Sequence, residues 1–151
     1  MQNYRKLRVW RKAFALAINV REATTHFPRT GYSELKAQIL SAAESIVFNI
    51  VEGCGASTRR EFARFLEIAA KSTMELEAEL ELARAYGALP NASWKRLSPE
   101  TIDTRRMLIG LRKTVLRQDL SESSVQRKTD QRVTQNEERA PGQEDASKDR
   151  Q

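Results

Sequence analysis

Residues 38–82 read QILSAAESIVFNIVEGCGASTRREFARFLEIAAKSTMELEAELEL, and this stretch decides the fold because it holds two amphipathic helices joined by a turn. Around its first half, apolar residues recur at intervals of three, four and seven, the spacing of one face of an α-helix. These residues are Leu35, Ile39, Ala42, Ala43, Ile46 and Ile50. A second set alternates spacings of three and four, as in the seam of a helical bundle. Its members are Leu66, Ala69, Thr73, Leu76, Leu80 and Ala83. The stretch predicts two neighbouring antiparallel helices.

The turn between these two helices is marked by Gly53 and Gly55. Glycine takes a positive φ without a Cβ penalty, so we expect both residues to end the first helix in that conformation. Thr58 followed by Glu61 forms a capping box, which satisfies unpaired amides at the start of a helix. The second helix is therefore expected to run from about residue 59 to residue 86.

Two more helices flank this hairpin. The earlier one has an apolar stripe with spacings of three and four, made of Trp10, Ala13, Ala17, Val20, Thr24 and Phe27. Pro28 and Gly31 break it. The last helix is expected to begin at Ser98, with Pro99 in its first turn. No alternating strand pattern occurs, so the predicted fold class is all-α, an up-down-up-down antiparallel four-helix bundle.

The chain of 151 residues divides into a predicted bundle domain, residues 1–120, and a polar C-terminal tail, residues 121–151. The tail has few large apolar residues, only Val125 and Val133, and cannot bury enough surface to offset chain entropy. We therefore predict that it is disordered. The whole chain has a net charge of +6, while residues 1–120 have 20 basic against 13 acidic residues. The folded part is the basic part.

A short motif at the end of the helix before the turn reads Asn-Ile-Val-Glu-Gly over residues 49–53. A run of further residues continues the same pattern, namely Arg60, Glu61, Phe62, Arg64, Phe65, Leu66, Ile68 and Ala69, and Trp10 also fits it. In these residues the sequence resembles the four-helix-bundle proteins encoded by intervening sequences in bacterial 23S ribosomal RNA genes. The resemblance covers roughly residues 7–117.

This resemblance implies a homo-oligomer, specifically a homopentamer, because known members form rings of five subunits. It extends to accessory variability determinant proteins of diversity-generating retroelements, which bind nucleic acid and a reverse transcriptase. The sequence departs from the family at Leu40 and Ser41, where a basic pair is usual, and at Ala56, where an Arg is usual. Basic contacts that relatives make at these positions are not expected here.

Apolar residues outside the bundle seams indicate an assembly surface. Seven residues fill an arc of about 220° on an angular plot, which is wider than the apolar face that a surface helix needs. They are Phe62, Ala63, Phe65, Leu66, Ile68, Ala69 and Ala70. Phe48 falls opposite Ile39, where a monomer would expose its ring. A further seam of spacing seven is formed by Ile102, Ile109 and Leu116. From the pattern alone, assembly and a monomer with a few exposed apolar residues stay open.

A polar stripe lies beside the apolar face of the helix that ends in the Asn-Ile-Val-Glu-Gly motif. It consists of Gln38, Ser45, Asn49 and Glu52, followed by Gly53. The stripe could line a cleft and bind a ligand, or it could hold neighbouring helices in register. We favour the structural role, because a half-buried polar group must find partners whether or not it binds a ligand.

The sequence offers no catalytic or metal site. His26 is the only histidine and Cys54 the only cysteine, so no di-iron set and no Cys-His pair is indicated. The glycines of the turn lack the Lys-Ser/Thr of a phosphate-binding loop. We therefore predict a protein that is not an enzyme and has no cofactor. The unpaired cysteine and the lack of a membrane span or secretion signal favour the cytoplasm.

Cations gather in two places, and phosphates favour such clusters. The candidate nucleic-acid-binding residues are Arg5, Lys6, Arg8, Arg11 and Lys12 at the start, and Arg105, Arg106, Arg112, Lys113 and Arg117 in the last helix. Tyr4 and Trp10 could stack on an unpaired base. Alternatively, the cations pair with carboxylates such as Glu75 or Glu77, or solvate the surface. Two functions remain: a bundle that binds structured RNA, or an interaction module without a nucleic-acid partner.

Overall fold

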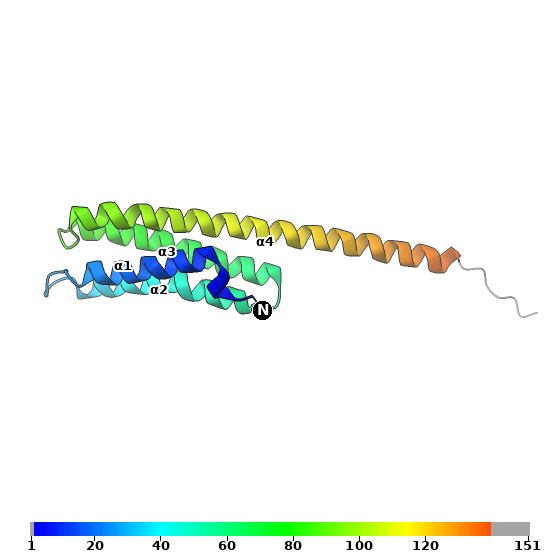
Figure 1. Ribbon diagram of the computed structural model, residues 1–151, viewed down its shortest axis with the longest axis horizontal. Helices are drawn as coiled ribbons and strands as arrows, with labels where there is room; N and C mark the ends of the chain where they lie inside the picture. The colour runs from blue at the N-terminus through cyan, green and yellow to red at the C-terminus, as the bar shows by residue number, and fades with distance from the viewer. Residues whose placement is uncertain (1, 140–151) are drawn as a thin grey trace, which may run out of the picture. The chain divides into compact units, whose positions relative to one another are not determined.

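The structure is a computed structural model that describes residues 2–139, and every regular element in that range is helical (Figure 1). The elements are a short 3₁₀-helix η1 (Tyr4–Lys6) and the helices α1 (Arg8–Thr24), α2 (Ser33–Gly55), α3 (Arg59–Ala85) and α4 (Asn91–Arg139). Short turns join consecutive helices, which therefore run antiparallel. The predicted all-α four-helix bundle is confirmed. The chain divides after Arg117 into two compact units, and the bundle is the first unit.

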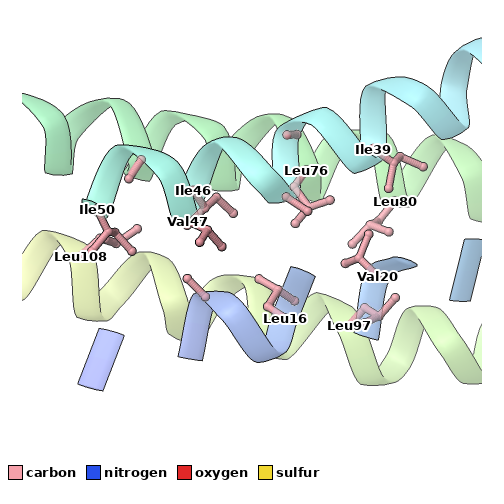
Figure 2. Packing of buried hydrophobic residues seen from close by; sticks show 14 of the residues in the cluster. Leu16, Val20, Ile39, Ile46, Val47, Ile50, Leu76, Leu80, Leu97 and Leu108 are labelled. Atoms are coloured by element: carbon pink, nitrogen blue, oxygen red, sulfur yellow. The ribbon is translucent and has the colours of Figure 1, made fainter. Parts of the chain in front are cut away.

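The core of the bundle is built from apolar side chains of all four helices, and the faces of α2 and α3 are the predicted ones. Figure 2 shows their side chains pointing toward one another between the helices. The largest fully buried ones include Leu16 and Val20 from α1, Ile39, Ile46 and Ile50 from α2, Leu66, Leu76 and Leu80 from α3, and Leu97 and Leu108 from α4. Burial of one such side chain contributes about 1.5–3 kcal/mol. In α1 the stripe is centred on Val9, Ala13, Leu16 and Val20, while Trp10 and Ala17 are only half-buried.

The turn between α2 and α3 confirms the capping box but not the predicted glycine conformations. The Glu61 amide donates to Thr58 Oγ1 at 3.1 Å, and the Ser57 amide donates to Glu61 Oε2 at 3.1 Å. The prediction of a positive φ at Gly53 and Gly55 was wrong, because both lie within α2. Elsewhere in the described range, positive φ occurs at Gly31 and Gly87, with values of 87° and 78°.

Close packing, rather than backbone conformation, explains why residue 53 is a glycine. A Cβ atom at this position would lie 2.7 Å from Phe62 Cδ2 and 3.0 Å from Phe65 Cβ. Real Cβ atoms do not approach that closely, so the absent side chain lets the end of α2 pack directly against the start of α3.

The start of α4 also differs from the prediction, since the helix begins at Asn91 instead of Ser98. The Trp94 amide donates to the Pro90 carbonyl at 3.0 Å, so the first turn forms there. Pro99 therefore lies in the helix interior, where it removes one backbone hydrogen bond. Its ring is on an exposed side of the helix, so water can satisfy the carbonyl left without a partner.

The second unit carries the end of α4, which continues to Arg139. Part of the segment predicted to be disordered, residues 121–139, is therefore helical, and residues 140–151 lie outside the described residues. The prediction rested on the lack of burial, and the described side chains here are indeed almost all exposed. Local pairs support the helix instead, as between Gln126 Nε2 and Asp130 Oδ1 at 2.9 Å. Over the described range, no helix has the length and apolar character needed to cross a bilayer.

Candidate nucleic-acid interface

The N-terminal cations lie on a segment that is fixed to the bundle. The Gln2 amide donates to the Cys54 carbonyl at 3.0 Å, which ties the chain start to the end of α2. The Asn3 side chain accepts from the Arg5 amide at 3.1 Å and caps η1. From this fixed segment and the first turns of α1, Arg5, Lys6, Arg8 and Arg11 project into solvent, and Lys12 is half-buried. Among residues 2–135, whose side chains the structure describes, none of these five cations has a carboxylate within 4.0 Å.

Three aromatic rings form a ladder beside these cations. The Tyr4 and Trp10 ring centroids are 5.0 Å apart in an edge-to-face arrangement, and those of Trp10 and Phe14 are 5.1 Å apart and stacked. The Arg5 guanidinium lies 4.7 Å from the Tyr4 ring. Trp10 is half-buried, whereas Phe14 is exposed. Phe14 is therefore the accessible ring, a residue that the sequence interpretation missed although its spacing of four from Trp10 could have indicated it.

The α4 cations divide into paired and unpaired residues. Arg105 forms an ion pair with Glu77, and Arg112 Nη2 lies 3.0 Å from Glu67 Oε2, so both join α4 to α3. Glu67 also contacts Lys71, and a hydrogen bond from Lys71 followed by the Arg112 charge lowers the pKa of Glu67.

The other three α4 cations project from the helix or pair within it. Arg106 lies 3.5 Å from Asp103 on its own helix. Lys113 and Arg117 are exposed, and no carboxylate among residues 2–135 lies within 4.0 Å of either. The alternative prediction, that the cations pair with carboxylates, therefore holds for Arg105, Arg106 and Arg112.

The register of α1 and α4 brings the two unpaired groups to one end of the bundle. Asn19 Nδ2 donates to Glu100 Oε2 at 3.1 Å, which sets these antiparallel helices at one height. Arg8 lies eleven residues before Asn19, and Leu111 lies eleven residues after Glu100. Equal rise per residue places Arg8 and Leu111 at similar heights. Lys113 therefore lies near the height of the N-terminal cations.

The polar stripe of α2 is only partly brought together. Ser45 Oγ and Ser72 Oγ are 2.8 Å apart across α2 and α3, and Asn49 Nδ2 donates to the Ser45 carbonyl at 2.8 Å. Ser72, which sequence reasoning missed, completes this small network. Gln38 and Glu52 are exposed and take no part in it, and Gly53 packs as described above. The link between α2 and α3 is made by Ser45 and Ser72, while Asn49, which we expected to hold the helices in register together with Glu52, bonds among the described side chains only to Ser45 of its own helix.

The described residues offer no catalytic set. No group of three or more His, Cys, Asp or Glu side chains within residues 2–139 could hold a metal ion. His26 is exposed after the end of α1, with Nδ1 3.3 Å from Thr25 Oγ1. Cys54 is buried, and burial raises the pKa of its thiol, so the neutral and less nucleophilic form dominates at neutral pH.

Exposed apolar side chains concentrate between α1 and α2. Phe14, Ile18 and Phe48 are 47%, 53% and 62% exposed, and they border an open hollow of about 200 Å³. The predicted exposure of Phe48 is thus confirmed. The residues of the predicted wide arc on α3 are mostly buried or half-buried in the bundle. Ile68 is the one member of the arc that is exposed. In the α4 seam, Ile109 is exposed, while Ile102 and Leu116 are half-buried.

Two comparisons with known proteins agree with this architecture. The family model described as 23S rRNA-intervening sequence protein matches residues 5–110. A crystal structure of a protein with unknown function from the S23 ribosomal protein family of Bacteroides thetaiotaomicron has a similar fold, with a TM-score of 0.65 and 24% sequence identity. The similarity covers 70% of this chain and 98% of that chain. No curated protein matches the sequence.

Proposed function

The chain belongs to the 23S rRNA-intervening sequence protein family, and on that basis we propose that it is a non-enzymatic, homo-oligomeric bundle that binds structured RNA in the cytoplasm. One observation carries the RNA-binding part. The N-terminal cations are held on a fixed segment without carboxylate partners among residues 2–135, and exposed Lys113 lies near their height. We call Arg5, Lys6, Arg8, Arg11, Lys12 and Lys113 the basic end.

Phosphate contacts explain how the basic end would act. Each Lys or Arg that neutralises a phosphate releases a condensed counterion, so affinity falls linearly with salt on a log–log plot. Five such contacts give a slope of about −4. Phosphate contacts fix orientation but read no sequence, and the exposed ring of Phe14 adds stacking for an unpaired base.

The experiment measures retention of a labelled RNA hairpin between about 50 and about 200 mM salt. The test variant is Arg8→Ala/Arg11→Ala/Lys12→Ala. Its matched control removes three exposed cations elsewhere, Arg29→Ala/Lys95→Ala/Arg96→Ala, and so has the same net charge. We expect the first variant to bind more weakly with a shallower salt slope, and the control to lose much less affinity. Equal losses of affinity in the two variants would show that binding depends on net charge alone.

The homo-oligomer is tested by mass, through size-exclusion chromatography with light scattering. The resemblance predicts five copies, and the exposed Phe14, Ile18 and Phe48 support assembly, since apolar patches commonly mark interaction sites. The same apolar patch also favours a second function, an interaction module without nucleic acid. If the protein retains no RNA at low salt, the interaction module remains as its proposed function. The resemblance to retroelement accessory proteins favours a protein as the partner of that module.

A further inference from the structure

Two hollows open on opposite sides of α2. The first, the α1–α2 groove, is bordered by Phe14, Ile18 and Phe48, with Arg21 and Glu44 also lining it. The second, the α2–α3 hollow, has a volume of about 420 Å³ and is polar. Its polar lining residues are Gln38, Ser41, Ser45, Glu75 and Glu79. The groove is thus mostly apolar with one cation and one carboxylate, and the hollow carries two carboxylates.

The α2–α3 hollow contains a carboxylate that lacks a partner within the described chain. Glu79 Oε2 is buried and has no hydrogen-bond partner among the side chains that the structure describes, residues 2–135. Burial, followed by the nearby charge of Glu75, raises the pKa of Glu79 to about 7. A buried acceptor without a partner is unfavourable, and a cation entering the hollow would satisfy it.

The residue rows beside the two hollows have complementary patterns. Phe14 and Arg21 on α1 lie seven residues apart, and Leu7, the residue before α1, lies seven residues before Phe14. On α3, Ile68, Glu75 and Leu82 also recur at intervals of seven, and all three are exposed. Rows of spacing seven are the repeat by which helices pack along one another. Apolar residues can therefore meet apolar residues while Arg21 meets a carboxylate.

We propose that the α1–α2 groove of one copy packs against the α2–α3 hollow of the next copy, with Arg21 reaching Glu75 and Glu79. The contact is head-to-tail, since the two faces differ. The inference rests on the proposed homo-oligomer and adds which faces build it. Phe48, which borders the groove, becomes covered at the edge of the contact.

A charge exchange tests this pairing. Arg21→Glu places like charges together and should weaken association on the order of 30-fold or more, as loss of a desolvated charge pair does. Adding Glu75→Lys and Glu79→Lys to Arg21→Glu should restore the wild-type mass. Arg29→Glu is the matched control, since it makes the same charge reversal outside both hollows and should leave the mass unchanged.

A cross-link provides a measurement that does not depend on charge. No Cα of α1 lies within 8 Å of a Cα of α3, two helices that are fully described, so cysteines on them cannot join within one copy. In a Cys54→Ala background, Arg21→Cys with Glu75→Cys should give a ladder of disulfide-linked copies on a non-reducing gel. Either variant alone should give no ladder.

The outcomes separate this inference from the proposed function. If the wild-type protein has the mass of a single copy, the homo-oligomer is refuted and the interface with it. If the wild type is oligomeric but Arg21→Glu keeps its mass, or the double cysteine variant gives no ladder, only the choice of faces is refuted. RNA retention, measured on the same samples, decides the RNA-binding part independently.

Discussion

Gly53 and Phe62 are in such close contact that a Cβ on the glycine would lie 2.7 Å from the Phe62 ring. The two residues lie on either side of the turn between α2 and α3, so their contact sets how closely the helix ends approach. A change at either residue alters the spacing of the whole hairpin.

We predict that Gly53→Ala destabilises the bundle by about 1–3 kcal/mol, the usual cost of overpacking a close contact. The matched control is Gly55→Ala. Gly55 is also helical but has open space where a Cβ would lie, so the same change should be neutral or stabilising through helix propensity. Urea denaturation followed by circular dichroism measures both. Equal effects at the two glycines would contradict the packing argument.

The hydrogen bond between Ser45 and Ser72 leads to a second prediction. Ser72→Ala leaves Ser45 without its partner on α3 and should lower the free energy of unfolding by about 0.5–1.5 kcal/mol. Ser41→Ala, an exposed serine on the same helix as Ser45, is the control and should change stability by less than about 0.5 kcal/mol.

Asn49→Ala distinguishes the two interpretations of the polar stripe. Because the Asn49 side chain bonds to Ser45, which bridges to Ser72, we expect its loss to reduce thermal stability or assembly. Thermal melting and light scattering measure these effects. Normal folding and mass together with lost RNA retention would instead assign Asn49 to ligand binding.

Glu79 should make the stability of a dissociated copy depend on pH. Its pKa is about 7 in the fold against an ordinary 4.5, so the folded state holds the proton more tightly. Stability contributed in this way is fully present below about pH 4.5 and is lost as the pH rises through 7. Thermal melts of the Arg21→Glu variant should show this decline, and adding Glu79→Gln should remove it. An unchanged pH profile after the second substitution would assign the decline to other groups.

A core substitution tests the packing itself. Leu76 is fully buried, so Leu76→Ala should cost about 2–5 kcal/mol. Met74, two residues away on the same helix, is exposed, so Met74→Ala should stay within about 0.5 kcal/mol. Denaturation of both variants under the same conditions decides whether the two positions differ as described.

The sequence was sufficient for the helices because their apolar spacing is a local signal. Ile39, Leu66 and Leu80 were placed in the core by periodicity alone, and all three are fully buried. The start of α4 was misjudged because Pro99 reads as a first-turn residue. Burial of neighbouring Leu97 favours a helix that continues through the proline, and burial of this kind depends on the other three helices.

The residues that make up the candidate site could be predicted from the sequence, but the partners of each residue could not. That Arg105 and Arg112 are engaged by α3 carboxylates depends on which helices are neighbours, as does the contact of Ser45 with Ser72. Phosphate-binding cations and structural cations look alike in a sequence. They differ only once a carboxylate on another helix lies within reach.

The backbone bond from Gln2 to Cys54 has a practical consequence for anyone preparing the protein. Because it holds the first residues against the end of α2, a purification handle fused ahead of residue 1 would lie beside the proposed phosphate-binding Arg and Lys side chains. An acidic leader there would compete with RNA for those cations and a polyhistidine would add charge of its own, so handles for binding assays belong at the opposite terminus.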